Sequence, residues 1–308
     1  LVRYAREAWE KTDKAYWKKG VALATKASLN MMRDEAFKAV FPAQKGIAGW
    51  MGDTRVKRSG RNLITTAQLE TLQKKLEPGD ILVERRNWYL SNIGLPGFWP
   101  HAELYSGTPA ELRAYFDADP EVKAVWPEGF TRHLEKSWPE AWAKLALNGH
   151  DGEPHRIVEA ISEGVVFSTL SEAALADYIG VLRPKLTKVE KARAIARAFA
   201  HHGKPYDFDF DFLTDATLVC SELVFKAFQA PKNEGRSLHV PLVRVAGRTT
   251  LPANEFVKRF DLDYGTDRQQ LEFVAFLDGR EGEGRAVDGT LEEFRASHRR
   301  MKWDIAQR

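Results

Sequence analysis

The chain has 308 residues, and 46 lysines and arginines against 43 aspartates and glutamates give it a formal net charge of +3. Its 44% hydrophobic and 11% aromatic content excludes disorder over most of the chain, and no apolar run approaches the ~18–20 residues of a transmembrane helix. The single cysteine excludes an intrachain disulfide framework and a cysteine-based zinc cluster, so it is either a small buried residue or a nucleophile.

The first 75 residues are strongly basic, with 16 lysines and arginines against 7 aspartates and glutamates. Apolar residues recur at helical spacing over 1–41, and a shorter helix is predicted at 66–76 after a glycine-rich loop. We interpret 1–75 as a helical N-terminal annex. Its charge is typical of a solvated helical face, and it also allows association with an anionic membrane surface. Because no nucleic-acid-binding motif accompanies the charge, no nucleic-acid partner is expected.

Five short strands are predicted in the region that follows. Their apolar or alternating runs are bounded by turn residues and lie at 81–85, 101–107, 156–160, 164–168 and 178–183. The third and fourth runs are joined by a tight turn at Gly164, which predicts a hairpin. Residues 108–154 separate the second run from the third, and we interpret them as an insertion with helical segments. Its three tryptophans suit a glycan or acyl surface on a wall of the substrate cleft, but buried packing is the preferred interpretation.

Two helices are predicted in the second half of the chain. Apolar residues recur at helical spacing over 188–201, before Gly203 and Pro205 end the helix. The apolar run 217–228 predicts a buried helix with the cysteine near its N-terminus. Between these helices, Asp and Phe alternate as in a half-buried extended segment. Farther along, the glycine-rich and charged stretch 278–290 is predicted to be mobile.

The position of Cys220 is favourable for a reactive thiol. Unpaired backbone N–H groups and the helix dipole favour a thiolate at a helix N-terminus. A thiolate nucleophile also needs an imidazole partner. Among the eight histidines, His101 opens a short strand and shares a strand face with Glu103, whereas the other seven have surface or helix-end surroundings. These residues alone leave open a Cys–His enzyme and a non-catalytic protein with a buried cysteine.

Five short motifs occur in one order over residues 77–230. They are Pro78-Gly79-Asp80-Ile81-Leu82, His101-Ala102-Glu103-Leu104-Tyr105, Val158-Glu159-Ala160 with Gly164-Val165, Lys204-Pro205-Tyr206-Asp207 and Cys220-Ser221-Glu222-Leu223-Val224. This order resembles the permuted papain-like cysteine amidases of the NlpC superfamily, the YiiX/YebB/YaeF-like group, and lecithin retinol acyltransferase-type folds. In this group the histidine strand precedes the cysteine helix in the chain. The resemblance implies an α+β fold whose central antiparallel sheet packs on the nucleophile helix.

The resemblance also implies roles for individual residues. Cys220 corresponds to the nucleophile and His101 to the general base, while the next strand supplies the polar residue that orients the histidine. Glu159 is our choice for that residue, and Glu103 is the alternative. Two residues along a strand are ~6.6 Å apart, so Glu103 is expected beside the imidazole rather than behind it. Tyr206 matches a tyrosine that lines the site in this superfamily, where it either donates to an oxyanion or packs under the sheet.

The predicted protein thus has a helical annex at 1–75, a permuted papain-like catalytic domain at 76–245 with the insertion 108–154, and a C-terminal extension at 246–308. We expect a thiol hydrolase that cleaves an amide, such as a cell-wall peptide, or an ester through a thioester intermediate. A lipid acyltransferase or esterase of the same fold and a non-catalytic binding module are the alternatives. No cofactor or metal is expected, because His101, Glu103 and Glu159 have no familiar metal-ligand spacing.

The expected partners are a peptide, a peptidoglycan fragment or a lipid as substrate, and a membrane surface contacted by the basic annex. The first residues are not a secretory signal and the chain starts without Met. We therefore expect that a signal or lipid anchor has been removed. The bacterial cell envelope or periplasm is the favoured location, with the cytoplasm as the alternative, since a lone cysteine is compatible with either redox environment.

Overall fold

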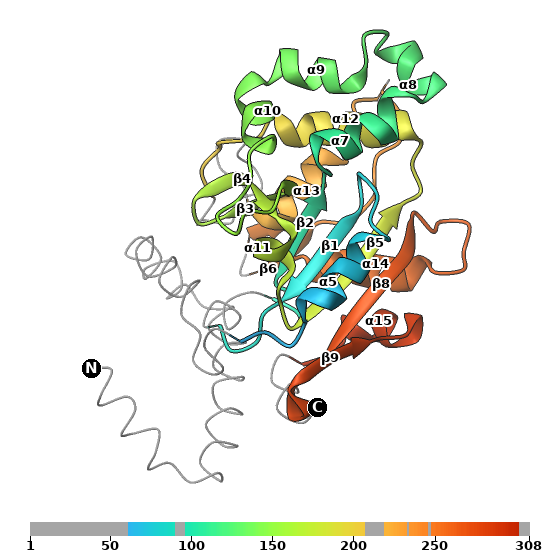
Figure 1. Cartoon of the computed structure of the whole chain (residues 1–308). Coiled ribbons are helices and arrows are strands. Elements are labelled where there is room, and N and C mark those ends of the chain that lie inside the picture. The colour runs from blue at the N-terminus through green and yellow to red at the C-terminus, as the bar shows by residue number, and fades with distance from the viewer. Residues whose placement is uncertain (1–60, 90–95, 207–218, 233, 246–247, 302–308) are drawn as a thin grey trace.

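The computed structural model describes residues 61–301, except for residues 90–95, 207–218, 233 and 246–247 (Figure 1). Most of the proposed annex 1–75 and nearly all of the predicted extended segment between the two helices lie outside these residues. The first described helix is α5 (Thr66–Gln73), which begins after Thr65, whose hydroxyl accepts a hydrogen bond from the Gln68 N–H group. None of the described helices combines the length and apolar character that crossing a lipid bilayer demands.

Seven strands form one sheet in the order β4-β3-β2-β1-β5-β8-β9, and every neighbouring pair is antiparallel. The five predicted strands are all present, as β1 (Ile81–Arg85), β2 (His101–Tyr105), β3 (His155–Ile161), β4 (Gly164–Thr169) and β5 (Tyr178–Pro184). Strands β3 and β4 pair as the predicted hairpin. The expected α+β fold with a central antiparallel sheet is therefore confirmed.

The C-terminal part of the chain completes this sheet. Strand β8 (Leu271–Arg280) pairs with β5, and β9 (Arg285–Asp288) returns along β8 after the short 3-10 helix η3 (Glu281–Glu283). The prediction that residues 278–290 are mobile is wrong, because most of this stretch forms the end of β8, η3 and β9. Buried Asp278 bonds to Arg300 at 2.6 Å and to Arg280 at 3.1 Å. The stretch set apart as an extension, 246–308, thus supplies two strands of the main sheet.

Two further helices lie in the C-terminal part of the chain, next to β8. Helix α14 (Asn254–Asp263) packs against α15 (Leu291–Ser297), and α15 packs on β8. The Phe294 ring on α15 is fully buried, and a Cβ added at Gly180 would lie only 2.1 Å from it. Gly180 therefore allows the ring to lie directly on β5. A separate two-stranded sheet consists of β6 (Val243–Val245) and β7 (Arg248–Thr250).

The two predicted helices of the second half are α12 (Lys188–Phe199) and α13 (Cys220–Ala227). They pack against each other, and α13 also lies on β2 and β3. Both helices bury small or apolar residues along one side, as their spacing predicted. Helix α13 begins at Cys220, so the cysteine is the first residue of the helix that lies against the histidine strand.

The insertion 108–154 is helical and continues the core. Its elements are α7 (Pro109–Leu112), the π-helix η2 (Arg113–Asp117), α8 (Pro120–Val125), α9 (Phe130–Ser137) and α10 (Pro139–Leu145). Helices α8 and α9 lie above α12 in Figure 1 and pack on it, while α10 packs on β3. The rings of Phe116 and Phe130 are fully buried, and Trp126, Trp138 and Trp142 pack partly buried against the same core. The contacts of the three tryptophans therefore agree with their interpretation as packing residues.

The main sheet separates two apolar clusters. Along β1, Ile81 and Val83 belong to the larger cluster, and Leu82 belongs to the smaller one. This division follows from the alternation of side chains along a strand. The smaller cluster is covered by α5 and by α11 (Leu170–Ala174), which pack on each other. Glu84 continues the strand face of Leu82 and so belongs to this second side of the sheet.

Candidate active site

Strand pairing brings four charged side chains of β1, β2 and β3 to one face of the sheet. Glu84 of β1 lies directly opposite His101 of β2. Between β2 and β3, Leu104 lies opposite Val158, and the same antiparallel register brings the preceding residue, Glu103, beside Glu159. Glu103 also shares the strand face of His101, two residues along. Three carboxyl groups therefore surround one imidazole.

Among these carboxylates, Glu159 makes the close contact with the histidine. Its Oε2 atom lies 2.9 Å from His101 Nε2, which is hydrogen-bonding distance. The Oε1 atom of Glu103 lies 3.6 Å from the same nitrogen, too far for a hydrogen bond but close enough for an ion pair. The structure thus places Glu159 where it can orient the imidazole and Glu103 alongside it.

Cys220 lies at the other side of the imidazole. The thiol is buried, and its Sγ atom lies 3.9 Å from the carbonyl oxygen of Pro100, the residue before the histidine. Burial by itself would raise the pKa of Cys220, but the charge of His101, a hydrogen bond with His101 and the backbone N–H groups of Ala102 and Ser221 lower it below its usual value. The surroundings of the thiol therefore favour the thiolate.

The histidine shows the complementary change. Burial by itself would lower the pKa of His101, but the charge of Cys220 and hydrogen bonds with Cys220 and Glu159 raise it well above its usual value. Since Nε2 faces Glu159, Nδ1 is the ring nitrogen left for the thiol. A lowered thiol pKa beside a raised imidazole pKa favours a thiolate–imidazolium pair.

Glu159 is held in its ionised form. Burial alone would raise the pKa of Glu159, but the hydrogen bond and charge of His101 and a hydrogen bond with Ser168 of β4 lower it. Burial and the charge of Glu159 raise the pKa of Glu103 well above its usual range. The pKa values of the two carboxyl groups beside the same imidazole therefore shift in opposite directions, because like charges repel in a buried site.

Two residues of this cluster were missed by the sequence reasoning. Burial raises the pKa of Glu84, while Arg86 opposes this shift with its Nε atom 3.3 Å from Glu84 Oε2. The Arg86 guanidinium also donates to the carbonyl oxygens of Glu172 and Ala173 on α11, at 2.6 and 2.9 Å. Alternation along β1 was the available signal for Glu84, but only the register with β2 shows that it faces the histidine.

Tyr206, the fourth site residue suggested by sequence, is half-buried and packs against the larger apolar cluster. This contact agrees with the packing alternative for the tyrosine ring. A role of its hydroxyl in stabilising an oxyanion stays a prediction.

Comparisons with known proteins place this arrangement in a family. The sequence model of the permuted papain-like amidase enzymes, YaeF/YiiX, C92 family, matches residues 75–261, which is more than half of the chain. A search of curated proteins found no match. Among solved structures, the chain is similar to the metalloprotein yiiX from Escherichia coli O157:H7, with 18% identity over 65% of this chain and 88% of that chain and a TM-score of 0.33.

The family match includes the strand of His101, the strand of Glu159 and the helix of Cys220. The match ends within α14, so β8 and β9 lie beyond it although they complete the same sheet. The chain belongs to the YaeF/YiiX family of permuted papain-like amidases and is a hydrolase of that class.

Proposed function

We propose that this amidase acts through Cys220 as nucleophile, His101 as general base and acid, and Glu159 as the residue that orients the histidine. The observation that carries the proposal is the position of His101, whose Nε2 atom lies 2.9 Å from Glu159 while its charge and hydrogen bond lower the pKa of Cys220. A thiol activated by an imidazole, with the imidazole held by a third polar group, is the arrangement that covalent acyl transfer needs.

In the proposed reaction, the Cys220 thiolate attacks the carbonyl carbon of an amide. The negative charge that develops on the carbonyl oxygen is stabilised by backbone N–H groups at the start of α13. Imidazolium Nδ1 of His101 gives its proton to the leaving amine as the C–N bond breaks, which leaves a thioester on the enzyme. His101 then takes a proton from water, the resulting hydroxide attacks the thioester, and the carboxylic acid product and the thiol are released.

We propose an amide substrate, a peptide or a peptidoglycan fragment, because the family is one of amidases. A lipid ester remains the alternative substrate, and a bacterial envelope location remains the favoured one. Hydrolysis of a peptide-amide panel and a lipid-ester panel by the same preparation separates the two substrate classes. Activity confined to esters would reject the amide assignment.

The thiol assignment is tested by Cys220→Ala, with Ser221→Ala as the control for a change at the head of α13. We expect Cys220→Ala to abolish hydrolysis and the mass increase of a trapped thioester, while the circular dichroism spectrum stays unchanged. Ser221→Ala keeps the thiol and should retain the thioester adduct. Full hydrolase activity in Cys220→Ala would reject the proposed nucleophile.

A further inference from the structure

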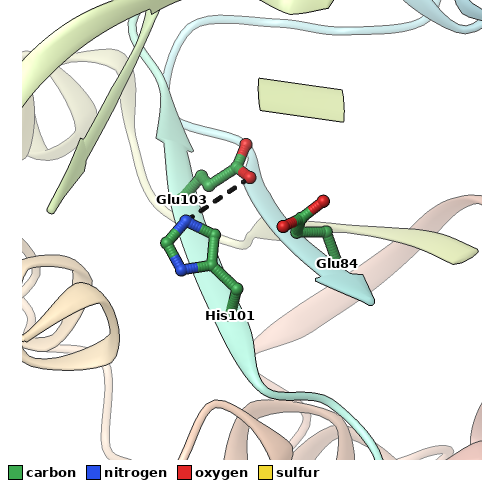
Figure 2. Close-up of side chains that lie close together, drawn as sticks. All are labelled: Glu84, His101 and Glu103. Carbon is green, nitrogen blue, oxygen red and sulfur yellow. Dashed lines mark ion pairs between the residues drawn. The ribbon is translucent and has the colours of Figure 1, made fainter. Parts of the chain in front are cut away.

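We propose that Glu84, His101 and Glu103, with Glu159 beside them, form a binding site for a zinc ion. The ligand atoms of Glu84, His101 and Glu103 lie within 4.8 Å of one another, and these residues come from the adjacent strands β1 and β2. Figure 2 shows the three side chains pointing toward one another. The amidase reaction proposed above uses His101 and Glu159 but gives no role to Glu84 or Glu103.

Glu103 is the observation that points to a ligand. Its side chain is fully buried, yet neither of its carboxylate oxygens has a hydrogen-bond partner among the described residues. Burying a polar group without hydrogen bonds is costly, so a buried carboxyl group that makes none needs an explanation. Both oxygens are available to a cation, and one of them already faces His101 Nε2.

The distances fit tetrahedral coordination. Zinc binds imidazole nitrogen and carboxylate oxygen at about 2.0–2.2 Å, so two ligand atoms on a tetrahedral ion are roughly 3.3–3.5 Å apart. The distances from His101 Nε2 to Glu159 and Glu103 are 2.9 and 3.6 Å, on either side of this value. Small side-chain shifts would place both carboxylates on one ion, with Glu84 as the further ligand.

The charges of the cluster favour a divalent cation. When Glu84, Glu103 and Glu159 are all ionised, as ligation of a metal requires, the Arg86 guanidinium balances one of their three charges and a divalent cation balances the other two. Arg86 contacts Glu84 at Oε2, and a divalent cation would compete with this guanidinium for the carboxylate. Imidazole with carboxylates suits zinc better than magnesium, which prefers oxygen ligands and retains water. The side chain of His101 is 17% exposed and provides an entry path.

Zinc at this position would act on the proposed reaction, and this part of the inference rests on the proposed function. With zinc on Nε2, a neutral imidazole carries its proton on Nδ1, which then cannot accept the thiol proton. The ion would also separate Glu159 from the imidazole that it orients. Zinc is therefore expected to inhibit without binding the sulfur of Cys220.

The binding test uses the full chain and zinc chloride, with calorimetry and metal analysis after dialysis. A Cys–His pair can itself bind zinc, so the reference protein is the variant Cys220→Ala, which lacks the thiol. The readout is zinc binding and does not depend on enzyme activity. We expect one zinc ion per chain in this variant. Adding Glu103→Gln or Glu84→Gln should weaken binding at least about 10-fold, the loss typical of even outer contacts to a metal. The matched control is Glu163→Gln, in the exposed β3–β4 turn, which should leave zinc affinity unchanged.

Two outcomes would overturn the proposal. The first is absence of zinc binding by Cys220→Ala, and the second is unchanged affinity in both folded Glu→Gln variants. X-ray absorption of the zinc-loaded wild type adds an independent readout, because a zinc–sulfur distance of about 2.3 Å would place the ion on Cys220 instead. If zinc binds as expected but the wild type has no thiol-dependent activity, the proposed function fails while the metal site stands.

Discussion

Replacing Glu159 by glutamine separates the two candidates for the orienting carboxylate. The change keeps the shape of the side chain but removes its charge, 2.9 Å from His101 Nε2. A hydrogen bond between charged groups contributes about 1.5–3 kcal/mol, which corresponds to roughly a 10- to 150-fold lower kcat/KM. Since the carboxylate is buried, solvent screens this interaction little. The same change at Glu103, whose oxygen lies 3.6 Å from that nitrogen, should cost less.

Two assays can test this prediction, and neither requires the natural substrate to be known. The first is the rate of iodoacetamide alkylation of Cys220 at pH 6, which reports the thiolate fraction. The second is hydrolysis of whichever model amide the wild type cleaves. Glu159→Gln should lower both, because a less stabilised imidazolium supports less thiolate. A larger loss in Glu103→Gln than in Glu159→Gln would refute the reasoning and assign the orienting role to Glu103.

Three further predictions follow from the same structure. Activity should show a bell-shaped pH profile. The thiolate is lost as pH falls through the lowered pKa of Cys220, and the imidazolium is lost as pH rises through the raised pKa of His101. A profile that rises to a plateau at alkaline pH would contradict the ion pair. Gly180→Ala should cost about 1–3 kcal/mol by overpacking against Phe294, and thermal unfolding of this variant with and without Phe294→Ala should show non-additive losses. Deletion of 271–308 should abolish cooperative unfolding, because it uncovers the edge of β5; a cooperatively folded product would show that β8 and β9 are dispensable.

Burial gives the candidate site its electrostatic character. A solvated thiol and imidazole interact weakly, but here Cys220 is buried and His101 is largely shielded from solvent, so each charge stabilises the other strongly. The same burial opposes ionisation of Glu103 while the contact with His101 keeps Glu159 ionised. The fold thus shifts the pKa values of two chemically identical side chains on the same face of the sheet in opposite directions.

Much of the fold followed from local patterns in the sequence. Each predicted strand from 81–85 to 178–183 is present, because alternation of apolar side chains and flanking turn residues are properties of the strand itself. The helix that carries Cys220 was recognised for the same reason. Composition misled at 278–290, where glycines and charges are typical of a loop. There, the pairing of β8 with β9 and the buried ion pairs of Asp278 stabilise strands instead.

The sequence by itself determined the single cysteine, its place at a helix N-terminus and the order of the histidine and glutamate strands. It did not determine what surrounds the histidine. Glu84 and His101 are neighbours only because β1 and β2 pair in one register, and Glu103 approaches Glu159 through the register of β2 with β3. Register depends on contacts between strands that are distant in the chain. The lone cysteine that excluded a cysteine-based zinc cluster therefore interacts with a histidine whose carboxylate neighbours only the tertiary structure brings together.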